Sequence, residues 1–156
     1  GDGSSTVEQT GTSADCSGGS PRYYAWYEMY PKFPVNLSIA IRPGDSINGS
    51  VTTDGRGRFT LTLHNNTTGG NFVTTQNLKR AKLASAEAIA EAPSGSGGVL
   101  PLTNFGTASF SAVTVNGAAI GSFNPDRIDM VSGGVTKAQT SALSGGTSFS
   151  VAWKHS

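Results

Sequence analysis

Charged side chains are scarce in this sequence. Asp, Glu, Lys and Arg make up 13% of the 156 residues, against about 25% in ordinary soluble domains. The 11 basic and 10 acidic residues leave a net charge of +1, which provides no basic surface for the phosphates of a nucleic acid. We therefore expect no nucleic-acid partner. Gly, Ser and Thr are abundant instead, a composition that favours short strands, tight turns and a secreted protein.

Long apolar runs are also missing. A membrane-spanning helix needs about 20 consecutive apolar residues, and no stretch approaches that length, so no membrane contact is expected. The chain opens on Gly-Asp-Gly without a signal peptide, and we expect a secreted, extracellular protein that is already processed. With 36% hydrophobic residues and no repeat or long linker, residues 1–156 suit one domain with a real core.

Cysteine occurs only once. Cys16 lies in a Gly/Ser-rich stretch, residues 15–20, where we expect a surface loop. Such a thiol is usually free or bonded to another chain, and an exposed free thiol is disfavoured in an oxidising compartment. The two histidines, His64 and His155, are far apart and lack ligand spacing with Cys16. We therefore expect no metal site and no cofactor.

Alternation with a period of two dominates the rest of the chain. Residues 58–64 place Phe and Leu on one face and Thr and His on the other, the pattern of a half-buried strand. Asp54-Gly55 precedes this strand and residues 65–70 follow it, both with good hairpin chemistry. The pattern predicts an all-β sandwich or barrel. Further strands are expected at residues 35–41, 46–53, 71–76, 108–115, 127–131 and 148–153.

Residues 24–30 predict a strand with an unusual face. Alternation places Tyr24, Trp26, Glu28 and Tyr30 on the same side. A carboxylate among three large aromatic rings is costly to bury unless it is paired or the face is an open groove. One interpretation is a strand whose Glu28 simply reaches solvent. The other is an aromatic-walled substrate cleft.

Residues 78–92 support two conflicting predictions. Their content of Ala, Lys, Leu and Glu favours a helix, on which Glu87 and Glu91 would share a solvated face. As a strand ended by Pro93, the segment would instead place Glu87, Ile89 and Glu91 on one side and small alanines on the other. Propensity alone favours the helix.

Several motifs, taken in order, point to a known family. They are Gln-Thr-Gly at 9–11, Ala-Trp-Tyr-Glu-x-Tyr-Pro at 25–31, Pro-Gly-Asp-Ser at 43–46, Ala-Glu-x-Ile-x-Glu at 86–91, Phe105-Gly106 and Gly-Thr-Ser-Phe-Ser-Val-Ala-Trp at 146–153. This ordered set resembles the glutamic peptidases, or eqolisins, over essentially the whole chain, and is closest to bacterial secreted members. The resemblance implies a bent antiparallel β-sandwich of two large, concanavalin-like sheets with the active site on the concave face. It also makes residues 83–91 a strand.

The same resemblance implies a catalytic pair. The family's catalytic glutamine falls on Gln9 and its catalytic glutamate on Glu91. A water held between them attacks the peptide bond: the glutamate removes its proton and returns it to the leaving amine, while the glutamine amide donates to the oxyanion. The chemistry needs no covalent intermediate, metal or cofactor. The implied activity is a pepstatin-insensitive acid endopeptidase that acts on polypeptides.

Four further residues are candidates for the cleft. Trp26 and Glu28 match family residues that line it, and the resemblance gives them supporting roles or places in the substrate wall. Tyr24 shares their face of the predicted strand. Glu87 is the glutamate near Glu91 that the motif does not select for catalysis, and we group it with the residues around the cleft.

The sequence departs from the family at its start. Members carry an N-terminal stretch that ends in Trp-Val-Gly-x-Asp, which is absent here. The chain therefore resembles the heavy chain of an autoprocessed member, completed by an N-terminal light-chain fragment that Cys16 would bind through a disulfide. Two other interpretations stay open. One is a carbohydrate-binding β-sandwich module with Tyr24, Trp26 and Tyr30 exposed, and the other is an inactive peptidase-like domain.

Overall fold

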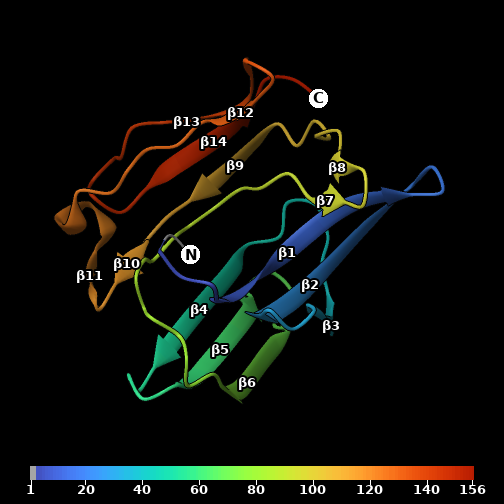
Figure 1. The fold of residues 1–156 in the computed structure, drawn as a ribbon. Coiled ribbons are helices and arrows are strands. Elements are labelled where there is room, and N and C mark those ends of the chain that lie inside the picture. Colours follow the sequence, from blue (N-terminus) through green and yellow to red (C-terminus); the bar gives the residue numbers. More distant parts are fainter. Residues whose placement is uncertain (1–2) are drawn as a thin grey trace. The chain divides into compact units, whose positions relative to one another are not determined.

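The computed structural model describes residues 3–156 and divides the chain into two compact units, Gly1–Ser85 and Ala86–Ser156. Regular structure in the described residues consists of strands, apart from the short 3-10 helix η1 (Ile120–Phe123) (Figure 1). The predicted all-β class is confirmed. In this part of the chain, no helix is both long and apolar enough to cross a membrane.

The first unit contains two three-stranded antiparallel sheets. One has the order β1-β2-β3 and the other the order β4-β5-β6. Their strands are β1 (Val7–Ser17), β2 (Ser20–Tyr30), β3 (Val35–Ala40), β4 (Ile47–Thr53), β5 (Arg58–Asn65) and β6 (Asn71–Asn77). The strands predicted at residues 35–41, 46–53, 58–64 and 71–76 are all present, because each has local alternation and flanking turn residues.

The turn between β1 and β2 is shorter than predicted. Residues 15–20 were expected to form a loop, but Asp15 pairs with Arg22 and Cys16 with Pro21 in the ladder. Only Gly18 and Gly19 make the turn, with φ values of +59° and +78°. A two-residue hairpin turn with positive φ at both positions matches the twist of the flanking strands. The glycines therefore allow the ladder to continue almost to the tip.

The core of the first unit joins its two sheets. Met29 of β2 packs with Phe59 and Leu61 of β5, all at most 3% exposed, and Tyr27 and Leu78 pack against this cluster. Each buried side chain of this size contributes about 1.5–3 kcal/mol to stability. Because side chains alternate along a strand, the face of β2 that carries Trp26 and Glu28 is the one opposite this core.

The second unit is built on a four-stranded antiparallel sheet of order β12-β13-β14-β9. Its strands are β9 (Thr107–Phe110), β12 (Met130–Ser132), β13 (Val135–Thr140) and β14 (Phe149–Trp153). Two small hairpins accompany the sheet: β7 (Ser94–Gly95) with β8 (Gly98–Val99) precedes β9, and β10 (Thr114–Val115) with β11 (Ala118–Ala119) lies between β9 and β12 in the chain. Its buried core consists of Leu102, Ala138 and Val151, flanked by the stacked rings of Phe110 and Phe149.

Two predicted strands of the second unit are shorter in the structure. The segment expected at 108–115 is interrupted between β9 and β10, where Ala112 adopts a φ of +53°. This left-handed conformation breaks an extended strand. The segment expected at 127–131 becomes regular only at Met130.

Both predictions for residues 78–92 are wrong in their secondary structure. The structure has neither a helix nor a strand between the end of β6 at Asn77 and the start of β7 at Ser94. Leu83 adopts a φ of +51°, which interrupts a helix and a strand alike. Within the described residues, no ladder includes this segment; near its start, the Leu78 N–H donates to the Gly57 carbonyl and the Ala81 N–H to the Leu78 carbonyl.

Candidate functional site

The β1–β2 hairpin presents one continuous face opposite the core of the first unit. In the antiparallel register, Gln9 lies opposite Glu28, Gly11 opposite Trp26, Ser13 opposite Tyr24 and Asp15 opposite Arg22. Since alternate side chains point to the same side of a sheet, these eight residues share one surface, here called the hairpin face. The structure therefore brings together four of the predicted site residues.

The two polar residues at the start of this face are bonded to each other. The Gln9 side-chain amide donates a hydrogen bond from Nε2 to Glu28 Oε2, with a distance of 2.5 Å, and both side chains are half-buried. A carboxylate accepts but does not donate when ionised, so the NH₂ end of the amide must face it. Glu28 thus fixes the orientation of Gln9 and leaves the second N–H of the amide available to another acceptor.

Trp26 lies next to this pair and is held by the backbone of β1. A Cβ atom added at Gly11 would come within 3.3 Å of Trp26 Cζ2, so the glycine gives the indole its room. The indole Nε1 is buried and has no hydrogen-bond partner among the described residues. A buried donor without a partner costs about 1–3 kcal/mol.

Tyr24 lies further along the hairpin face. Its hydroxyl donates to Asp15 Oδ2 over 2.5 Å. This hydrogen bond and partial burial raise the pKa of Tyr24 above its ordinary value. Asp15 was missed by the sequence analysis because residues 15–20 were assigned to a loop. The alternation of Gln9, Gly11 and Ser13 continues to Asp15 and could have identified it.

Glu91 and Glu87 belong to the second unit. Both are exposed, as is Ile89, while Ala90 and Ala92 are half-buried and pack against the core of that unit. The strand pattern therefore predicts the sides of Glu87, Ile89, Glu91 and Ala90, but Ala86, expected on the alanine side, is exposed. Packing of the two alanines fixes the backbone on either side of Glu91. The pairing of Glu91 with Gln9 stays a prediction.

Among residues 3–156, no group of three or more His, Cys, Asp and Glu side chains is arranged so that it could hold a metal ion. Cys16 is exposed and free.

Sequence comparison relates the whole chain to one family. The profile of the peptidase A4 family matches residues 1–153. Aspergillopepsin-2 of Aspergillus niger is 29% identical over 141 residues, which cover 86% of this chain and 50% of that protein. The chain thus spans about half the length of this curated relative.

Structural comparison gives the same result. The crystal structure of aspergilloglutamic peptidase from Aspergillus niger matches with a TM-score of 0.83 and 27% identity, over 96% of this chain and 91% of that one. Scytalido-glutamic peptidase with a transition state analog inhibitor matches with a TM-score of 0.68 and 22% identity, over 96% and 77%. The predicted antiparallel β-sandwich is therefore the fold of this chain.

Proposed function

Because the chain belongs to the peptidase A4 family, we propose that it is an acid endopeptidase that cleaves polypeptides with a water activated by Gln9 and Glu91. The observation that carries the proposal is the hydrogen bond from Gln9 to Glu28 on an aromatic-walled face. A solvent-exposed structural glutamine has no need of such a fixed orientation. In this proposal, residues 1–156 act as one domain.

Gln9 acts as the oxyanion donor. One amide N–H is engaged by Glu28, and the other donates to the oxygen that becomes negative when water adds to the peptide carbonyl. A single donor of this kind contributes about 2.7–4 kcal/mol to transition-state stabilisation. A neutral amide donates at any pH, so this role does not depend on acid.

Glu91 acts as general base and then as general acid. As a carboxylate, it takes a proton from the water whose oxygen bonds to the carbonyl carbon. When the tetrahedral intermediate collapses, the C–N bond breaks and the same proton passes to the leaving amine. Positioned proton transfer contributes about 10²–10⁴ in rate. No covalent bond to the enzyme forms at any step.

An acidic working pH follows from this double role. A carboxyl group that must both accept and return a proton works best at a pH close to its own pKa. The oxyanion donor imposes no competing requirement, because Gln9 does not titrate. This design differs from a dyad of two carboxylates, in which one must remain protonated in order to donate.

The proposal includes a second polypeptide and secretion. The β1 strand lies at the edge of its sheet in the first unit, where unpaired N–H and C=O groups invite another strand. Cys16 near the end of β1 is exposed and is the one cysteine in residues 1–156, so a disulfide at Cys16 needs a cysteine outside these residues. An N-terminal light-chain fragment produced by autoprocessing fits both features. Intact masses measured with and without reductant test this: equal masses corresponding to one chain contradict it.

The activity is tested by cleavage of an unfolded protein substrate at acidic and neutral pH. We expect cleavage only in acid, resistance to pepstatin, and a loss of at least about 10²-fold in kcat for Glu91→Gln. Asp126→Asn is the matched control, because it makes the same change at another exposed acid of the second unit. Glu87→Gln distinguishes the two neighbouring glutamates.

The other possible results of this assay each contradict a different part of the proposal. Full activity of Glu91→Gln contradicts the assigned base, and loss of activity in Glu87→Gln alone transfers the role to that residue. Absence of cleavage by residues 1–156 alone favours a missing N-terminal fragment, whereas absence of cleavage in the presence of that fragment favours an inactive peptidase-like domain or a carbohydrate-binding module. The second of these is then separated by binding to polysaccharides.

A further inference from the structure

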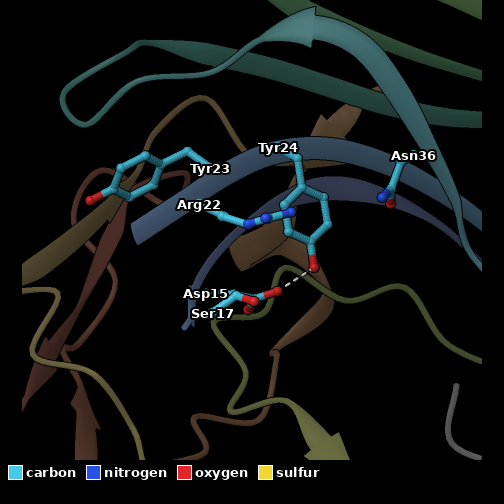
Figure 2. Close-up of a pocket in the computed structure, with 6 residues that line it drawn as sticks. All are labelled: Asp15, Ser17, Arg22, Tyr23, Tyr24 and Asn36. Carbon is cyan, nitrogen blue, oxygen red and sulfur yellow. Dashed lines mark hydrogen bonds between the residues drawn. The ribbon is translucent and has the colours of Figure 1, made fainter. Parts of the chain in front are cut away.

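An open pocket of about 600 Å³ lies at the far end of the β1–β2 hairpin. It is lined by Asp15, Ser17, Arg22, Tyr23, Tyr24 and Asn36. These residues come from β1, β2 and β3 (Figure 2). The pocket is thus formed entirely within the first unit.

The pocket continues the surface that carries Gln9. Asp15, Arg22 and Tyr24 belong to the hairpin face, and Asn36 of β3 lies beside Trp26 in the register. Ser13 lies four residues and Asp15 six residues beyond Gln9 in the same strand. At about 3.4 Å per residue, these separations correspond to about 14 and 20 Å. An extended peptide whose scissile bond lies at Gln9 therefore reaches the pocket about four to six residues away.

One side of the pocket is already hydrogen-bonded. The Tyr24 hydroxyl points at Asp15 and donates to its Oδ2, whereas Tyr23 points away from Tyr24 (Figure 2). This bond fixes the orientation of the Tyr24 ring, here called the aromatic wall of the pocket, and engages one oxygen of the Asp15 carboxylate. Asp15 thus has a hydrogen-bond partner inside the pocket through one of its two carboxylate oxygens.

Apart from Asp15, the pocket contains one cation, Arg22, and neutral polar groups on Ser17, Tyr23 and Asn36 that both donate and accept. Arg22 is exposed and carries five N–H donors with a permanent positive charge. Asn36 adds an amide and Ser17 a hydroxyl. Guanidinium geometry matches a carboxylate, which can accept two parallel hydrogen bonds. Asp15 lies opposite Arg22 in the ladder and balances its charge, and the guanidinium is the pocket group whose geometry matches a second, incoming carboxylate beside the Tyr24 ring.

We infer that this pocket is a remote substrate subsite that holds an acidic side chain about four to six residues from the scissile bond, with Arg22 as its specificity-determining residue. The inference rests on the proposed peptidase function. It adds a substrate preference that Gln9, Glu28 and Glu91 do not explain.

The test uses three fluorogenic peptides with the same cleaved core. A short peptide extends three residues on each side of the scissile bond, and two long peptides carry either Asp or Asn at positions four to six on both sides. Assays run near pH 5, where a peptide Asp with its ordinary pKa of about 3.9 is mostly ionised. We expect kcat/KM for the Asp peptide to exceed that for the Asn peptide about 2- to 5-fold, as for an exposed ion pair.

Arg22→Gln should reduce this ratio to about one, because it removes the charge while retaining polar character. Arg80→Gln, at another exposed arginine of the first unit, should leave the ratio unchanged, and the short peptide should be cleaved equally by all three proteins. Equal cleavage of the Asp and Asn peptides by the wild type, or a ratio that survives Arg22→Gln, overturns the subsite while the peptidase function stands. Failure to cleave even the short peptide in the presence of the N-terminal fragment overturns both.

Discussion

The two regions that supply Gln9 and Glu91 are built differently. Gln9 lies within an 11-residue strand whose every residue pairs with β2, and its side chain is bonded to Glu28. Glu91 lies in a segment without helix or strand, anchored by Ala90 and Ala92 on the core of the second unit. One region is positioned by backbone hydrogen bonds and the other by packing. We therefore expect substitutions beside Gln9 to lower kcat and substitutions beside Glu91 to lower the free energy of unfolding.

Among the variants that test this difference between the two regions, Glu28→Gln should have the largest effect on kcat. The substitution keeps the size of the side chain but replaces a charged acceptor by a neutral amide. Hydrogen bonds to charged groups contribute about 1.5–3 kcal/mol and neutral ones about 0.5–1.5, so we expect kcat to fall about 10-fold. Since Glu28 acts through Gln9, KM should change little.

Steady-state kinetics of Glu28→Gln across the acidic range provides the measurement. Asp126→Asn serves again as control. Comparison with Glu28→Ala sharpens the result, because alanine removes the acceptor altogether and should lower kcat further. A rise in KM at constant kcat would instead make Glu28 a contact for substrate.

Ala90→Leu tests the packed region. The larger side chain does not fit the half-buried position against the core of the second unit, and overpacking costs about 1–3 kcal/mol in the free energy of unfolding. Urea denaturation measures this loss. Ile89→Leu is the control, because Ile89 is 53% exposed and exposed substitutions usually change stability by less than about 0.5 kcal/mol. Equal stability of both variants would show that alanine packing does not hold the segment.

This contrast also explains what the sequence predicted well. The faces of residues 24–30 and 58–64 followed from alternation, because each strand has one face on a core. In residues 87–92 the alternation correctly predicted which side chains are exposed, whereas Ala86, expected on the packed side, is exposed. It failed to give the secondary structure there, since a strand requires a ladder partner and helix propensity ignores the alanine contacts with the core.

The hairpin tip shows a different limit of sequence-based prediction. Gly and Ser at 15–20 are typical of a loop, yet two glycines suffice for the turn and Asp15 remains in β1. The partner of Asp15, Tyr24, is nine residues away along the chain. Their contact depends on the register of the hairpin, which is set by the turn and which composition does not reveal.

The smallest effect should come from Tyr24→Phe, which removes the hydroxyl that Asp15 accepts. The pKa of Tyr24 is raised in the folded protein, first by this bond and then by burial. Its contribution to stability is therefore fully present below the ordinary tyrosine pKa of about 10 and is lost as the pH rises through the folded pKa. Denaturation midpoints of wild type and Tyr24→Phe should differ slightly at pH 7 and converge in the alkaline range. A difference that stays constant with pH would mean that the hydroxyl contributes by packing alone, and the aromatic wall would then not depend on Asp15.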